Sequence, residues 1–110
     1  MQALSKGFPL QNGKYLILRT LGQGGFGITY EAEQPMLQRT VAIKEFFMKD
    51  CCSRDEETSR VVAGTGSLRG LVEKFKGKFI KEAQMIAGMD HPNIVRIIDV
   101  FEENGTAYNR

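Results

Sequence analysis

The sequence predicts an α+β fold in which a five-stranded antiparallel sheet carries one main helix. Three segments rich in strand-forming residues follow one another between 14 and 47, and their connections are too short for parallel crossovers. Apolar residues then recur every three or four positions from 68 to 86, which is the spacing of one helical face. A hairpin signal at Asn104-Gly105 separates two further strand-like segments.

The first half of the chain supplies three strands. We expect residues 1–13 to form a loose lead-in, because glycine, proline and Asn-Gly there favour turns. The elements that follow are predicted in this order: a strand at 14–21, a glycine turn at 22–27, a strand at 28–34, a turn at 35–39 and a strand at 40–47.

A long polar loop at 48–66, with room for a short hairpin, leads into the helix. Ser67 can cap the start of the helix and Gly88 can end it. Gly77 predicts either a bend near the middle or a short helix that leads into a longer one at about 76–88. A turn at 90–93, a fourth strand at 94–101 and a fifth strand from Thr106 complete the prediction.

The composition is ordinary for a globular protein. The net charge is +2 with both signs interspersed, which argues against a nucleic-acid binder. No apolar run approaches the roughly 20 residues that a membrane span needs, and the N-terminus lacks the apolar core of a signal peptide. The adjacent Cys51 and Cys52 are expected to be reduced thiols, and no metal site is expected. We therefore expect a cytoplasmic protein without membrane contact in this segment.

The glycine turn carries the pattern G-x-G-x-x-G at Gly22, Gly24 and Gly27. A dinucleotide-binding turn with this pattern needs a helix directly after it, but Ile28-Thr29-Tyr30 continues as a strand. The P-loop pattern fails as well, because no Gly-Lys-Ser/Thr ends the stretch. A hairpin with glycines at its tip can instead fold over a nucleotide, with backbone N–H groups facing phosphate oxygens. Phe26 at the tip either covers the phosphates or is an exposed loop aromatic.

Lys44 follows on the third strand, on the same face as Ala42 and Phe46. A lysine among apolar residues needs a partner, and Glu82 beside the apolar stripe of the helix is the candidate. The alternatives are two surface charges without contact, or pairing of Lys44 with Glu73.

Four stretches in this order resemble the N-terminal lobe of a eukaryotic-like protein kinase. They are Gly22-Gln23-Gly24-Gly25-Phe26-Gly27, Val41-Ala42-Ile43-Lys44, Phe79-Ile80-Lys81-Glu82-Ala83 and His91-Pro92-Asn93-Ile94-Val95. The amino-acid sequence around the glycines and directly after the lysine is most similar to that of bacterial serine/threonine kinases. The resemblance covers residues 14–110 and implies a kinase N-lobe there.

The resemblance implies roles for individual residues. Leu21 and Ala42 would line the adenine pocket together with Thr29, which stands where the family usually has valine. Lys44 would hold the α- and β-phosphates of ATP, and Glu82 would hold Lys44. Ile86 and Ile97 would stack in an apolar spine, and His91 would be a structural turn residue. The phosphates would be covered by Gly22, Gln23, Gly24, Gly25, Phe26 and Gly27.

The resemblance also implies chemistry that this sequence does not hold. The family's catalytic Asp and its metal-binding Asp lie in H-R-D-x-x-x-x-N and D-F-G motifs, and neither motif occurs here. We therefore expect the ATP-binding part of a serine/threonine kinase that uses Mg²⁺ and phosphorylates a protein substrate, and we expect this chain alone to be inactive. The alternative is a stand-alone binding module or pseudokinase, with self-association through the exposed underside of the sheet.

Overall fold

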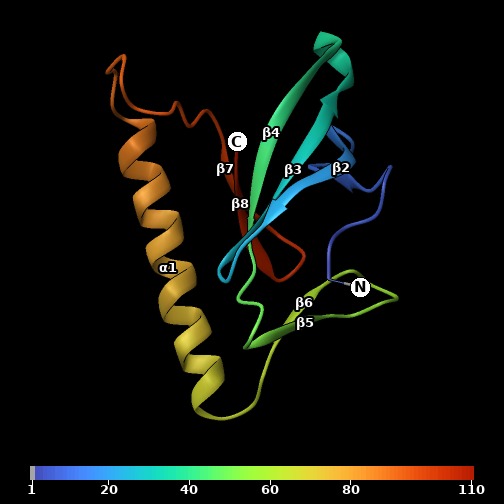
Figure 1. Cartoon of the computed structure of the whole chain (residues 1–110), viewed down its shortest axis with the longest axis vertical. Coiled ribbons are helices and arrows are strands. Elements are labelled where there is room, and N and C mark those ends of the chain that lie inside the picture. Colours follow the sequence, from blue (N-terminus) through green and yellow to red (C-terminus); the bar gives the residue numbers. More distant parts are fainter. Residues whose placement is uncertain (1) are drawn as a thin grey trace.

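The computed structural model describes residues 2–110, which form two small sheets and one long helix (Figure 1). The strands are β1 Pro9–Leu10, β2 Tyr15–Gln23, β3 Gly27–Gln34, β4 Arg39–Phe46, β5 Cys52–Arg54, β6 Val61–Ala63, β7 Val100–Glu103 and β8 Thr106–Asn109. The 3-10 helix η1 spans Pro35–Leu37 and the helix α1 spans Ser67–Ala87.

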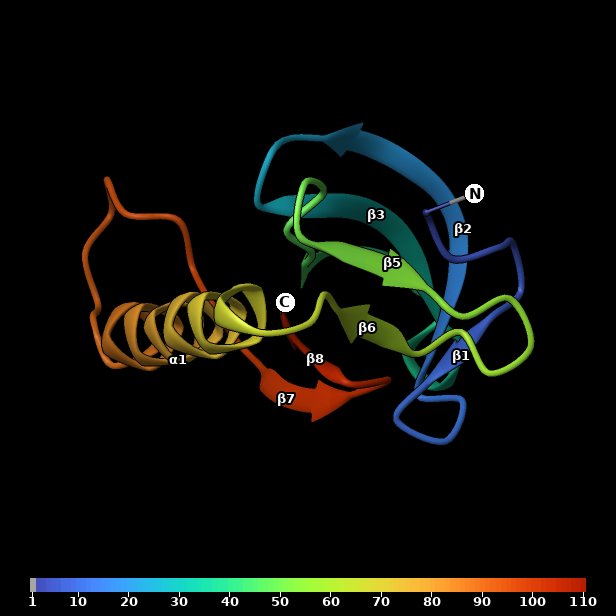
Figure 2. The ribbon, with the colours of Figure 1, turned by 90° about the horizontal axis from the view of Figure 1, so that it is seen from below.

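The main sheet confirms the predicted α+β class. Its six strands lie in the order β1-β2-β3-β4-β8-β7, and all of its pairs are antiparallel. The prediction of five strands missed β1, which is only two residues long. The loop at 48–66 contains the separate β5–β6 hairpin, which nests inside the curve of the main sheet in Figure 2.

The two faces of the main sheet pack against different neighbours. Ile43 and Phe47 point into a core that includes Leu4 and Val61, from the N-terminal segment and the hairpin. Phe46, on the opposite face of β4, packs with Met48 and Val72 between the sheet and α1. The alternation along β4 therefore places one face on the core and turns the other toward the helix.

Helix α1 is one continuous helix through Gly77, so the division into a short and a longer helix is wrong, and Figure 1 shows no kink near its middle. Gly66 occupies the N-cap position and no side chain caps the first turn, so Ser67 lies inside the helix instead of capping it. Gly88 ends the helix as predicted. No helix in the described part of the chain combines the length and the apolar character that crossing a bilayer requires.

Two further expectations are wrong. The first residues are not loose, because Leu4 is buried and Leu10 in β1 pairs with Tyr15 in β2. The division of the chain at residue 14 into lead-in and lobe stays a prediction. The strand predicted at 94–101 begins only at Val100, which pairs with Asn109 of β8. Directly before it, the backbones of Ile98 and Asp99 hydrogen-bond to Arg110, and within residues 2–110 the segment 94–97 pairs with no strand. The predicted turn holds His91, whose Nδ1 accepts a hydrogen bond from the N–H of Asn93 at 3.1 Å.

Candidate functional site

The glycine turn forms the tip of the β2–β3 hairpin. The N–H of Gly24 donates to the carbonyl of Gly27 at 2.9 Å and closes the turn. A Cβ on Gly22, Gly24 or Gly25 would meet no atom within 4 Å, so this side of the loop faces open space. A Cβ on Gly27 would instead lie 2.9 Å from the backbone oxygen of Glu45, which explains why only glycine fits there.

The turn is tied to the segment that follows β4. The N–H of Phe47 donates to the carbonyl of Phe26 at 2.9 Å, and the N–H of Lys49 donates to the carbonyl of Gly25 at 3.1 Å. The Phe26 side chain is half exposed and lies against Phe75 of α1, with 5.4 Å between the ring centroids. The hairpin tip therefore contacts both the sheet and the helix.

Lys44 lies on the face of β4 that looks toward α1. Its pairing partners across the sheet are Thr29 in β3 and Asn109 in β8, and Thr29 in turn pairs with Gly22. Its side chain lines two neighbouring cavities of about 270 and 390 Å³. Glu82 lines both cavities as well.

The first cavity is aromatic. Phe26, Phe46, Phe75 and Phe79 line it, together with Lys78. The second cavity contains Thr29, Ala42, Ile86 and Ile97. The structure thus brings together several residues that the sequence singled out, from the glycine turn, β3, β4, α1 and the segment after α1.

Lys44 and Glu82 are not ion-paired: among residues 2–110 no contact within 4.0 Å joins them. Glu73 is not a rival partner for Lys44, because its carboxylate lies 3.6 Å from Lys76 Nζ. Lys44 and Glu82 are both exposed, so their side chains have room to move.

Other predicted site residues lie away from these cavities. Leu21 is 47% exposed on β2 and lines neither of them. The Gln23 amide donates to Gln2 Oε1 at 2.8 Å, so this side chain is held by the N-terminal segment. No cluster of His, Cys, Asp and Glu suited to a metal ion occurs in the described residues.

A polar cluster that the sequence did not lead us to expect lies directly behind Lys44. Glu45 is fully buried, and its carboxylate accepts hydrogen bonds from the hydroxyls of Tyr30 and Tyr108 and from the Arg54 guanidinium. Arg54 also donates to the backbone carbonyls of Gln2 and Ser59, at 2.6 and 2.8 Å. The alternation of the sequence along this strand could have indicated that Glu45 is buried, because Glu45 lies on the same core face as Ile43 and Phe47. This cluster anchors the strand that carries Lys44.

Comparison with known proteins adds independent information. No protein-family model matches the sequence. The chain is 36% identical over 97 residues to the serine/threonine-protein kinase PrkC of Bacillus subtilis, a match covering 88% of this chain and 12% of PrkC. It is 34% identical over 94 residues to the serine/threonine-protein kinase pkn2 of Myxococcus xanthus, covering 86% of this chain and 9% of pkn2. The chain thus spans only a small part of the curated relatives it matches.

Solved structures agree with these relatives. The apo form of PpkA-294 superposes with a TM-score of 0.90 at 30% identity, covering 99% of this chain and 38% of that one. The kinase domain of PknI from Mycobacterium tuberculosis gives a TM-score of 0.64 at 20% identity and so shows the fold alone.

Proposed function

Because this chain is homologous to the N-terminal lobe of bacterial serine/threonine protein kinases and has the fold of that lobe, we propose that it binds ATP. The observation that carries the proposal is the position of Lys44. Its side chain lines two cavities beside the glycine hairpin and has no ion-pair partner in the described part of the chain. A free ammonium at a concave site is suited to phosphate oxygens.

The residues present fit this ligand. The open side of Gly22, Gly24 and Gly25 gives room for phosphates beneath the backbone. Thr29 and Ala42 line the second cavity, and Leu21 lies on β2 next to the glycine turn. We assign these three residues to the adenine side of the site. ATP would bring the γ-phosphoryl group and an associated Mg²⁺ ion. The lobe's own contribution is to hold and orient the phosphates.

Glu82 would act as a positioning residue. It lines the same cavities as Lys44 from the side of α1. We infer that the two charges pair when nucleotide is bound, because both side chains line the same cavities and an ion pair would fix the direction of the ammonium. The full protein would transfer phosphate to a protein serine or threonine.

The proposal is tested by titrating the 110-residue chain with ATP and MgCl₂ and following the amide NMR signals of the glycine hairpin. Lys44→Ala should weaken binding at least about tenfold, because it removes the charged donor to phosphate. Lys81→Ala is the matched control, since Lys81 is exposed on α1 and lines neither cavity. Equal affinity of the Lys44→Ala variant and the native chain would contradict the proposed site.

A phosphotransfer assay with casein addresses the activity of the chain by itself. We expect none, since the sequence contains neither an H-R-D-x-x-x-x-N nor a D-F-G motif to supply the base and the metal ligand. Phosphate transfer that disappears in Lys44→Ala would overturn this expectation.

A second function, as a binding module, has its own support. Several apolar side chains are exposed at the end of α1 and in the segment after it: Met85, Met89, Ile94, Val95 and Ile98. We propose that this set, called the apolar rim below, mediates contact with another protein surface or with a second copy. We also infer a cytoplasmic location, supported by the two free cysteines and by the need for ATP.

A further inference from the structure

The end of β2 is the side of the glycine hairpin that is held by fewer strand contacts. On its inner side β2 pairs with β3, but the register shifts between Ile17 and Arg19 and again between Thr20 and Gly22. On its outer side β2 pairs with β1 only through two residues near its start, and among residues 2–110 no strand pairs with the rest of that edge. The last residues of β2 therefore need other contacts to fix their position.

The side chain of Gln23, the last residue of β2, points away from the nucleotide side of the hairpin. Gln23 pairs with Ile28, and directly opposite residues of antiparallel strands share a face. Ile28 is fully buried in the core of the sheet. The preceding residue, Gly22, pairs with Thr29, which lines the second cavity with Lys44 on the other face. A contact of the Gln23 side chain therefore leaves the nucleotide side free.

The partner of this side chain is Gln2. The Gln23 amide donates to Gln2 Oε1 at 2.8 Å. Gln2 is itself held in place, because its backbone carbonyl accepts a hydrogen bond from Arg54 Nε at 2.6 Å. Two residues further on, Leu4 is buried and its N–H donates to the Tyr30 hydroxyl at 3.0 Å. The N-terminal segment therefore offers a fixed point to the end of β2.

This fixed point is connected to the strand that carries Lys44. Arg54 and Tyr30 both donate to the buried carboxylate of Glu45, the residue directly after Lys44 on β4. Hydrogen bonds thus run from the end of β2 through Gln2 and Arg54 to β4. The β3 side of the hairpin pairs with β4 along its whole length. Both sides of the glycine hairpin are therefore held relative to Lys44.

We propose that Gln2 is a positioning residue of the ATP site, which holds the glycine hairpin in place through Gln23. This inference rests on the proposed function, because the position of the hairpin matters only if its backbone N–H groups bind phosphates. A hairpin that is ordered before binding loses less conformational freedom when the phosphates arrive, so the contact raises the affinity for ATP. Adenosine has no phosphates, so its affinity does not depend on this contact.

The test compares ATP with MgCl₂ and adenosine as ligands of the 110-residue chain, by titration of its amide NMR signals. Gln2→Ala removes the side-chain acceptor but keeps the backbone carbonyl that Arg54 uses. It should weaken ATP binding about threefold and change adenosine binding less than about 1.5-fold. Gln11→Ala is the matched control. The Gln11 amide donates to Glu103 at 3.0 Å, outside the hairpin, and its loss should leave ATP binding unchanged.

A double-mutant cycle distinguishes this contact from a general effect on the fold. Gln23→Ala should weaken ATP binding as much as Gln2→Ala does, and the two changes combined should weaken it no further, since both remove the same hydrogen bond. In ¹⁵N relaxation measurements, the amides of Gly24 and Gly25 should be more mobile in each variant. The circular dichroism spectrum, which reports the overall fold, should stay the same.

The outcomes separate this inference from the proposed function. If Lys44→Ala left ATP binding unaltered, the ATP site would be wrong and the role of Gln2 would fall with it. If Lys44→Ala weakened ATP binding and Gln2→Ala did not, only the role of Gln2 would be overturned. Equal losses of ATP and adenosine affinity in Gln2→Ala, or additive losses in the cycle with Gln23→Ala, would overturn it as well.

Discussion

Glu45 is a carboxylate on the core face of β4, and its hydrogen bonds to Tyr30, Tyr108 and Arg54 join three separate parts of the chain. The Arg54 side chain is only 5% exposed, so the ion pair is shielded from solvent. A buried pair of this kind adds little stability over an apolar replacement, but loss of one partner leaves the other charge without compensation.

Glu45→Ala should therefore destabilise the chain by about 3–5 kcal/mol in urea denaturation, because it strands the Arg54 guanidinium and two tyrosine hydroxyls. Glu31→Ala is the matched control. It removes an ion pair with Arg19 that is largely exposed, and it should cost less than about 1 kcal/mol. If Glu45→Ala lowered the free energy of unfolding as little as the control does, the cluster would not be coupled to folding.

The same cluster predicts a dependence of stability on alkaline pH. Burial, followed by the nearby Glu45 carboxylate, raises the pKa of both Tyr30 and Tyr108 above the ordinary value of about 10. Both hydroxyls thus hold their protons more tightly in the folded chain than in the unfolded chain. The contribution of these two hydroxyls to the free energy of unfolding is complete below pH about 10 and is lost as the pH rises through their folded-state pKa.

The unfolding free energy should accordingly fall above pH about 10, by about 1.4 kcal/mol per pH unit for each of the two tyrosines. Urea denaturation at several alkaline pH values measures this slope. Tyr108→Phe removes one of the two titrating groups and should reduce the slope by about half. An unchanged slope in that variant would assign the alkaline loss to other groups.

At the scale of elements, the sequence predicted those structures whose signal is local. The alternation along 28–34 and 40–47 and the helical period from 68 to 86 all correspond to observed elements, because each pattern reflects the burial of one face. The start of strand β7 was misplaced, since residues 94–97 have strand-forming side chains but pair with no strand among residues 2–110, while the backbones of Ile98 and Asp99 hydrogen-bond to Arg110. Strand formation depends on such distant pairing, which a local pattern does not record.

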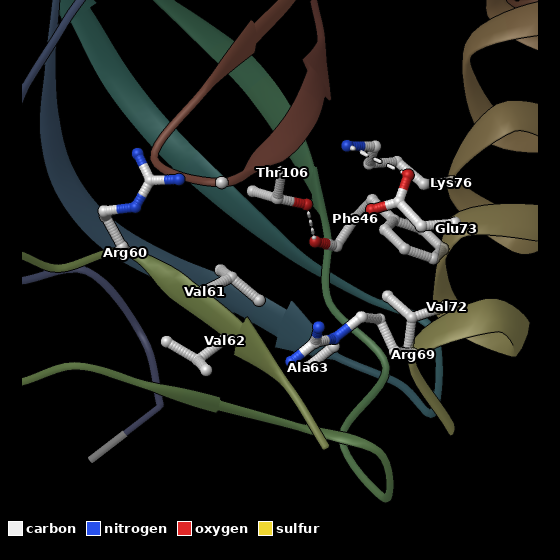
Figure 3. A pocket seen from close by; sticks show the side chains of 11 residues that line it. Phe46, Arg60, Val61, Val62, Ala63, Arg69, Val72, Glu73, Lys76 and Thr106 are labelled. Atoms are coloured by element: carbon white, nitrogen blue, oxygen red, sulfur yellow. Dashed lines mark hydrogen bonds and ion pairs between the residues drawn. The ribbon is translucent and has the colours of Figure 1, made fainter. Parts of the chain in front are cut away.

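For the candidate site, too, the sequence predicted the positions of residues on single elements but not the contacts between elements. Lys44 and Glu82 were predicted from their strand and helix positions, and both line the same cavities. Their ion pair is absent from the described residues. A sequence pattern places a residue on a strand or a helix face, but it does not fix the distance between side chains on two separate elements such as β4 and α1. The cavity of about 350 Å³ between β6, α1 and the β7–β8 turn (Figure 3) could not be predicted, since it is formed by residues from four separate segments of the sequence.

Helix α1 offers a test of local backbone preference. Gly77 lies in its interior, and a Cβ added at this position would meet no atom within 4 Å, so a side chain fits there. Gly77→Ala should stabilise the chain by about 0.5–1 kcal/mol, because alanine loses less backbone entropy on folding. Gly66→Ala is the contrasting variant and should destabilise, since Gly66 has a φ of +64°. Thermal unfolding followed by circular dichroism distinguishes the two directions.

At the scale of the molecule, the apolar rim should drive self-association. Val95 is 83% exposed and Ile98 is 62% exposed, so both present apolar surface to solvent. Sedimentation velocity should show a weight-average mass that rises with concentration, and Val95→Asp combined with Ile98→Asp should restore the monomer. Met36→Asp is a suitable control, because Met36 is 90% exposed at the distant β3–β4 turn. A monodisperse monomer at high concentration would count against this role of the rim.

The order of strands also has a consequence for synthesis on the ribosome. Strand β8 lies in the interior of the main sheet, between β4 and β7, although it is the last of the six strands of this sheet in chain order. Tyr108 reaches the Glu45 carboxylate across 63 residues of sequence. A nascent chain that has not yet reached Thr106 therefore exposes one edge of β4 and lacks one hydrogen-bond donor to its buried carboxylate. The sheet is therefore completed only by contacts that are distant in sequence, a topology that tends to slow folding and that keeps a strand edge of the growing chain exposed until β8 emerges.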